Sequence, residues 1–178
     1  GVLLGAMSGV FGVFGLGFRD VLELLRPIPP IAWVPIAILW FGLGDKSAWF
    51  VVFLGAFFPI FVQVAHAFAN CPDEYLEVSK AYEASSFDTF VWVRIPAAAP
   101  HIAQGLRVGL GLAWTSVIAA ELVGVKNGLG DRIQQLRYVS DYEGMLVCMI
   151  LIGMLGWSMT TAANVLQRWA VPWQKSSV

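Results

Sequence analysis

The polar side chains that lie within long apolar runs are the residues of this sequence best suited to act on a solute. Glu121 stands near the end of the run SVIAAELVG, and an ionisable group in such a run marks a functional site because it is costly to place there. Its role is either in a pathway or gate, or as a hydrogen-bonding group at a helix end. Trp114, Thr115 and Ser116 lie one turn or more deeper in the same run. These four residues are our candidates for a translocation pathway.

The sequence holds no constellation of residues that would catalyse a reaction. It has no glycine-rich loop of the Walker type, no cluster of metal-ligand residues and no paired nucleophile and base. Of the two cysteines, we place Cys71 at an aqueous surface and Cys148 inside an apolar run, which predicts neither a disulfide nor a metal site. We therefore predict that the chain is not an enzyme and binds no metal or other cofactor itself.

Composition indicates the class of protein. The chain has 178 residues, of which 58% are hydrophobic and 13% are charged, whereas soluble domains carry about 25% charged residues. Several apolar runs approach the length of about 20 residues that crosses a bilayer. We predict an all-α, polytopic transmembrane helical bundle; a soluble all-helical core is the alternative that the hydropathy disfavours. The net charge of −1 gives no basic balance that would indicate nucleic acid as a partner.

Five transmembrane spans are predicted within a single transmembrane domain that covers residues 1–178. The spans are residues 1–18, 31–43, 48–69, 97–123 and 143–166. Because the sequence opens with Gly1 inside an apolar run, we expect that a preceding first span is missing.

Small and proline residues distinguish some of these spans. Gly1, Gly5 and Gly9 recur every four residues, as do Gly105 and Gly109, and such spacing lets helix backbones approach closely in lipid. The second span is short, contains Pro35 and follows three further prolines, so it is a candidate for lining a pathway.

The longest polar interruption of the chain holds five of its twelve acidic residues. Residues 70–96 read as two short amphipathic helices, the second capped by Ser85 with Asp88 in a capping-box pattern and ended by Ile95 and Pro96. Two such helices suit docking into a groove of a soluble partner. The alternative is a hairpin that lies on lipid, but surface-lying helices are usually rich in Lys and Arg.

A second polar interruption follows the fourth span. There we expect Asp131 to cap a short helix that ends at Tyr138.

The distribution of basic residues gives a weak orientation signal. We place residues 19–26 as an amphipathic turn at the membrane interface, and we expect Arg107 to extend back toward the interface. With residues 70–96 in the cytosol, the cytosolic side holds Arg19, Arg26, Lys80, Arg94, Arg168 and Lys175, and the outer side holds Lys46, Lys126, Arg132 and Arg137. The bias has the sign of the positive-inside rule.

Residues 70–96 resemble the EAA signature of the permease subunits of ABC importers. Glu77 matches the glutamate, Val78 and Ser79 stand at the two alanine positions, and Ile95-Pro96 matches the apolar-proline pair. Glu83 stands where the family usually has glycine. Glycine reaches positive φ freely, whereas glutamate does so only under strain.

Further segments resemble the permeases for nitrate, sulfonate, taurine and bicarbonate. They are LRPIPPIAWVPIAILWFGLG (25–44), GLRVGLGLAWTSVIAAELVG (105–124) and NGLGDRIQQ (127–135), and the first two look closest to taurine and alkanesulfonate permeases. The resemblance implies the type I ABC importer permease fold with six spans and a location in the bacterial cytoplasmic (inner) membrane. It also implies an importer of a small anionic solute.

The partners implied by the resemblance are a second copy of this chain, two cytosolic ATPase subunits that bind ATP and Mg, and an external solute-binding protein. The residues implied to contact the ATPase are Glu77, Lys80, Ala81, Tyr82, Glu83, Ala84, Ser85 and Phe87. An anionic solute favours helix N-termini, hydroxyls and amides over a carboxylate. We therefore expect Trp114, Thr115 and Ser116 to face the dimer axis, and we do not expect Glu121 to hold the solute directly.

The alternative function is that of an ion-coupled secondary transporter or channel. Glu121, Arg107 and the proline-broken second span would suit it. The acidic element 70–96 distinguishes the two hypotheses, because a secondary transporter does not need a docking element of this kind.

Overall fold

The computed structural model describes residues 1–11, 22, 24–124 and 128–171, and these residues form helices and no strands. Among the described residues, three helices are long and apolar enough to cross a membrane: Asp45–Ala69, Ser86–Val123 and Tyr142–Trp169. They contain the predicted spans 48–69, 97–123 and 143–166. The predicted all-α membrane class is therefore confirmed.

The first two predicted spans have a different form. Helix α1 (Val2–Phe11) covers the first part of residues 1–18, and the rest of that prediction lies outside the described residues. The second predicted span, residues 31–43, corresponds to two short helices. They are η1 (Pro30–Trp33), of four residues, and α3 (Val34–Phe41), of eight. This segment is shorter than the roughly 20 residues that cross a bilayer. It is therefore not a full-length span.

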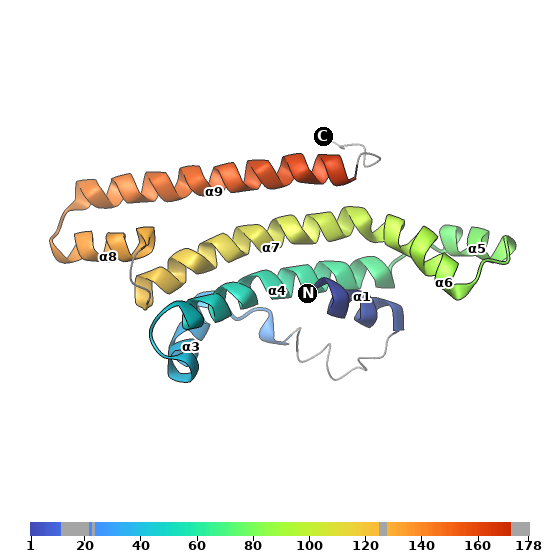
Figure 1. The fold of residues 1–178 in the computed structure, drawn as a ribbon, viewed down its shortest axis with the longest axis horizontal. Coiled ribbons are helices and arrows are strands. Elements are labelled where there is room, and N and C mark those ends of the chain that lie inside the picture. Colours follow the sequence, from blue (N-terminus) through green and yellow to red (C-terminus); the bar gives the residue numbers. More distant parts are fainter. Residues whose placement is uncertain (12–21, 23, 125–127, 172–178) are drawn as a thin grey trace.

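The long helices lie side by side, with the short helices at their ends (Figure 1). Helix α7 (Ile95–Val123) lies between α4 (Asp45–Ala69) and α9 (Tyr142–Ala170). Helices α5 (Asp73–Ala81) and α6 (Ser86–Asp88) lie at one end of the bundle, and α8 (Leu129–Tyr138) lies at the other. Helices α1 and α3 pack along different halves of α4.

Small residues bring the helices into close contact, as their spacing predicts. A Cβ atom added at Gly109 would lie 2.7 Å from Cγ1 of Ile60, and one added at Gly5 would lie 2.8 Å from the carbonyl oxygen of Phe61. Real Cβ atoms essentially never approach so closely. Both α7 and α1 therefore meet α4 at positions where only glycine fits, and this fixes their register along α4.

The segment that precedes η1, of which residues 22 and 24–26 are described, does not lie at the membrane interface as the sequence suggested. Leu22 is buried against Phe58 and Phe61, which belong to the middle of α4. The described part of residues 19–26 therefore lies beside the middle of a long helix instead of at a membrane interface. Arg26 accordingly is not one of the charges at the cytosolic end.

The second helix of the polar element does not end at Ile95 and Pro96, as predicted. It continues from Ser86 to Val123 through η2 (Thr89–Arg94), a stretch of π-helix. The backbone N–H of Ile95 donates to the carbonyl oxygen of Phe90, five residues back. This wider turn accommodates Pro96, which has no N–H to donate. In a regular α-helical turn the proline ring would clash with the carbonyl group of the preceding turn. The second half of the polar element and the fourth predicted span are consequently one helix.

Candidate functional site

The polar element at one end of the long helices is built around a tight turn between α5 and α6. The N–H of Ala84 donates to the carbonyl oxygen of Ser79 at 3.0 Å, and the N–H of Glu83 donates to that of Lys80 at 3.0 Å. This is the Schellman arrangement, in which the residue after the helix adopts positive φ and is usually glycine. Glu83 has φ +52°. The turn therefore keeps the shape that glycine normally supplies, at a cost in backbone strain.

Side chains join the two halves of this element and attach it to α4. The Oγ atom of Ser85 accepts the N–H of Asp88 at 3.1 Å and donates to Oδ2 of the same residue at 2.6 Å. Buried Ser79 on α5 accepts a hydrogen bond from Thr89 at 3.4 Å. The rings of Phe68 and Phe90 stack with centroids 5.8 Å apart. The predicted cap at Ser85 is confirmed, and the element packs against the end of α4.

All the residues predicted to contact an ATPase lie on the surface of this element. They are Glu77, Lys80, Ala81, Tyr82, Glu83, Ala84, Ser85 and Phe87, and each is exposed. Tyr82, Phe87 and Trp92 are 80%, 74% and 75% exposed, and Tyr75 and Val78 on α5 are exposed as well. A cavity of about 650 Å³ opens between α5 and the start of the next helix, with Lys80 and Arg94 in its lining. The surface combines exposed apolar anchors with a groove, and the roles of its residues stay predictions.

The structure does not bring Trp114, Thr115 and Ser116 together around one cavity. Ser116 is buried between α7 and α4, where its hydroxyl donates to the carbonyl oxygen of Leu112 at 2.6 Å. Trp114 packs in the opposite direction, against Gly156 on α9. Thr115 is exposed and donates to the same Leu112 carbonyl at 2.9 Å. Of the three side chains, Ser116 is buried, Trp114 is partly buried and Thr115 is exposed, and the pathway roles of all three stay predictions.

Glu121 joins two helices. Its Oε2 atom accepts the N–H of Gly130 at 2.8 Å, in the first turn of α8. A Cβ atom at Gly128 would overlap the Glu121 carboxyl group, so the chain passes directly over this side chain. The cap of α8 therefore comes from α7, whereas the sequence suggested Asp131, which accepts a hydrogen bond from Gln135 within α8. A carboxylate at a helix N-terminus is favoured by the helix dipole.

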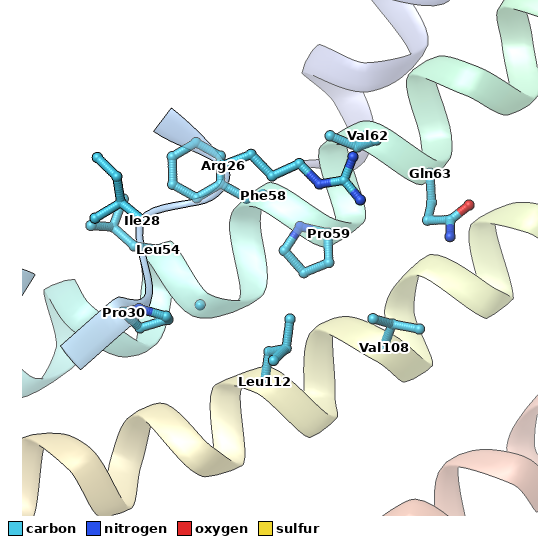
Figure 2. Close-up of a pocket in the computed structure, with 11 residues that line it drawn as sticks. Arg26, Ile28, Pro30, Leu54, Phe58, Pro59, Val62, Gln63, Val108 and Leu112 are labelled. Atoms are coloured by element: carbon cyan, nitrogen blue, oxygen red, sulfur yellow. The ribbon is translucent and has the colours of Figure 1, made fainter. Parts of the chain in front are cut away.

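A cavity of about 190 Å³ lies where the proline-rich segment crosses α4 and α7. Figure 2 shows the Arg26 side chain extending from this segment toward Pro59 and Val62 on α4, while the amide of Gln63 points toward α7. Val108 and Leu112 on α7 complete the wall. Our sequence reasoning missed this site because it placed Arg26 at the interface. An arginine directly before Pro27, inside a mostly apolar stretch, was the available signal.

Arg107 lies on another face of α7. It lines a separate cavity of about 140 Å³ together with Trp114 and Gly156, between α7 and α9. In the part of the chain that the structure describes, no group of three or more His, Cys, Asp and Glu residues could hold a metal ion.

Membrane-length helices, a broken helical segment beside a cavity and a folded polar element at one end are the organisation of a transport permease. A family model described as the binding-protein-dependent transport system inner membrane component matches residues 1–176. The chain belongs to this family of inner membrane transport components.

Three relatives illustrate the match. A putative ABC transporter permease of Methanocaldococcus jannaschii is 38% identical over 97% of this chain and 65% of its own length. The nitrate import permease NrtB of Synechococcus elongatus is 32% identical over 89% of this chain and 58% of its own. The putative aliphatic sulfonates permease SsuC of Escherichia coli is 32% identical over 85% of this chain and 58% of its own length. Other relatives are named as taurine and bicarbonate permeases. The chain thus spans about three fifths of the length of the curated relatives that it matches.

Proposed function

We propose that this chain is the permease subunit of an ATP-driven importer for a small anionic solute of the nitrate, sulfonate, taurine or bicarbonate type. Family membership and the names of the relatives support the substrate class. The observation that carries the proposal is the folded polar element at residues 70–96. It presents exposed Tyr82, Phe87 and Trp92 at one end of the long helices.

This element docks into a groove of a cytosolic ATPase. Exposed aromatic side chains on a polar surface are typical anchors of protein interfaces. The permease works as a homodimer with two ATPase subunits, which bind ATP and Mg, and it receives solute from an external binding protein. ATP hydrolysis takes place on the partner, and the chain itself binds no cofactor.

The continuous helix Ser86–Val123 supplies the coupling. Its first turns belong to the docking element, and Val108 and Leu112 on the same helix line the cavity. A movement that the ATPase imposes on Phe87 therefore reaches the cavity through one helix and no flexible joint. The result is alternating access, in which the long helices open first to the outside and then to the cytosol.

The test is a pull-down of tagged permease from its native membrane in mild detergent, with ATPase assay and mass identification of what accompanies it. Ala81→Asp places a charge on the docking face and is expected to release the ATPase. Val139→Asp is the matched control, because Val139 is 72% exposed at the other end of the bundle, next to α8. The control is expected to retain the ATPase.

Two outcomes would contradict this proposal. If Ala81→Asp keeps a full complement of ATPase, the docking face is not the one that we assign. If the chain purifies alone and moves solute into liposomes without ATP, it is a secondary transporter or channel.

A further inference from the structure

The cavity beside Arg26 lies halfway along the membrane-length helices. Pro59 on α4 lies about 21 Å from the start of the helix at Asp45 and about 15 Å from its end at Ala69, at 1.5 Å per residue. The hydrocarbon core of a bilayer is about 30 Å thick. The cavity therefore lies near mid-membrane depth, far from either aqueous surface.

The backbone at this depth is broken. Between Leu25 and Pro30 the chain is not helical, and the following helix begins at Pro30, which lines the cavity. Irregular backbone at membrane depth is tolerated where it is buried in protein or lines a water-filled space. Transporters use such breaks at their substrate sites. The break and the cavity coincide.

The polar side chains of this cavity suit an anion. The guanidinium group of Arg26 has five N–H donors in a planar fork, which matches a pair of oxyanion oxygens. Gln63 adds amide donors from α4. None of the described residues that line the cavity is acidic. The volume of about 190 Å³ equals that of about six water molecules at about 30 Å³ each, which is enough for a small anion.

We propose that this cavity is a mid-membrane binding site for a small oxyanion and that Arg26 is its principal ligand. Gln63 donates a second hydrogen bond. The ligand class is a singly charged group with at least two oxygens in one plane, which nitrate, bicarbonate and a sulfonate headgroup share. This proposal rests on the proposed function for its physiological meaning, because it names where the imported anion pauses on its way across. The binding itself is testable without transport.

The first experiment measures binding as protection of an introduced thiol. Cys71→Ser and Cys148→Ser remove the native thiols of the purified complex, and Val108→Cys places a new one in the cavity wall. The reagent is neutral N-ethylmaleimide, whose entry does not depend on charge. Sodium nitrate and sodium ethanesulfonate are compared with sodium gluconate at equal ionic strength. Leu112→Cys is a second reporter on the same wall, for use if the first variant does not fold.

The expected protection follows from simple occupancy. At ten times its Kd, nitrate slows labelling about tenfold. Arg26→Gln removes a charge-assisted hydrogen bond and weakens binding about tenfold or more, so the same concentration slows labelling at most about twofold. Arg107→Gln is the matched control: it removes an arginine from the neighbouring position of α7, which lines a separate cavity. Protection is expected to persist in this control.

The second experiment measures ATP-driven uptake by the same complexes in liposomes supplied with the binding protein. Arg26→Gln is expected to raise the KM or lower the rate about tenfold while the ATPase stays bound. The proposed binding site would be overturned if the anion protects the thiol equally well in the wild-type chain and in Arg26→Gln. It would also be overturned if protection is lost in Arg107→Gln but not in Arg26→Gln. Arg26-dependent protection in a wild-type complex that imports nothing with ATP would support the binding site and refute the importer.

Discussion

The contact between α4 and α7 at Gly55 allows a sharp test of what Ser116 does. A Cβ atom at Gly55 would overlap the Oγ of Ser116 and lie 3.1 Å from the carbonyl oxygen of Leu112. Gly55→Ala therefore forces these helices apart by about 0.5–1 Å before the contacts become ordinary. A gap of this size forfeits about a quarter to a half of the dispersion energy across it.

The expected size of the effect follows from two opposing contributions. Overpacking a well-filled contact costs about 1–3 kcal/mol. Alanine is better than glycine in a helix interior by about 0.5–1 kcal/mol, which offsets part of this cost. We expect Gly55→Ala to lower the free energy of unfolding by about 1–2 kcal/mol. In a chain of this size the midpoint of thermal unfolding then falls by about 2–8 °C.

The assay is thermal unfolding of the purified permease in detergent, followed for each single variant and for a double variant. Ser116→Gly removes the Oγ and Cβ atoms that the new methyl group would meet. Together with Gly55→Ala it is expected to be more stable than the sum of the single effects by about 1–2 kcal/mol. Gly111→Ala is the matched control on α7, because a Cβ atom there meets nothing within 4 Å. That change is expected to be neutral or slightly stabilising.

Additivity would refute this reasoning. If the two single effects sum to the double effect within about 0.5 kcal/mol, then Ser116 and Gly55 are not in contact. Ser116 would then be available to a solute, as its sequence context suggests. Strong coupling instead assigns Ser116 to helix packing.

Four further outcomes are expected. Glu83→Gly relieves the positive φ at the α5 turn and raises the free energy of unfolding by about 0.5–1 kcal/mol in the same thermal assay, while a lower midpoint would contradict the strain. Ser85→Ala removes the cap at the start of α6 at a cost of about 1 kcal/mol, measurable as faster hydrogen exchange just after residue 85. Glu121→Gln keeps an acceptor for the N–H of Gly130 but removes the charge, so ATP-driven uptake slows although the complex assembles; unchanged uptake would remove Glu121 from the mechanism. Burial raises the pKa of the Cys71 thiol, so fewer thiolates form at pH 7.5 and its alkylation is slower than that of a free peptide cysteine; an equal rate would contradict this.

Local chemistry made several features predictable from the sequence. The four-residue spacing of Gly105 and Gly109 predicted a close helix contact, and α7 meets α4 there. Ser85 and Asp88 predicted a helix start, because a side-chain cap acts within three residues. Glu83 marked a turn that normally needs glycine, and its φ is positive. In each case the residues that decide the structure are neighbours in the chain.

Contacts between distant segments were not predictable in the same way. Asp131 was the natural cap for α8 from local sequence, but the N–H of Gly130 is taken by Glu121, which reaches it from α7. Pro96 predicted a helix end, but a π-helical turn before it carries the helix onward. Arg26 looked like an interfacial charge from the sequence. Its depth depends on the packing of Leu22 against Phe58, which local sequence does not reveal. Tertiary packing decided the cap of α8 and the depth of Arg26, whereas the π-helical turn before Pro96 is a local backbone arrangement that a proline alone does not predict.

The same packing explains why a docking surface and a mid-membrane cavity can act together. Phe87 and Val108 lie about 32 Å apart along one uninterrupted helix at 1.5 Å per residue. The opposite wall of the cavity belongs to α4, which is tied to the docking element through Phe68 and Phe90. The third wall, at Arg26 and Pro30, belongs to the proline-rich segment, which is attached to α4 because Leu22 packs against Phe58 and Phe61. An ATPase that moves the element would therefore act on α7 directly, and on Arg26 only through α4. Val108 and Leu112 on α7 would then shift relative to Arg26, and this change in the cavity would release a bound anion toward whichever side has opened.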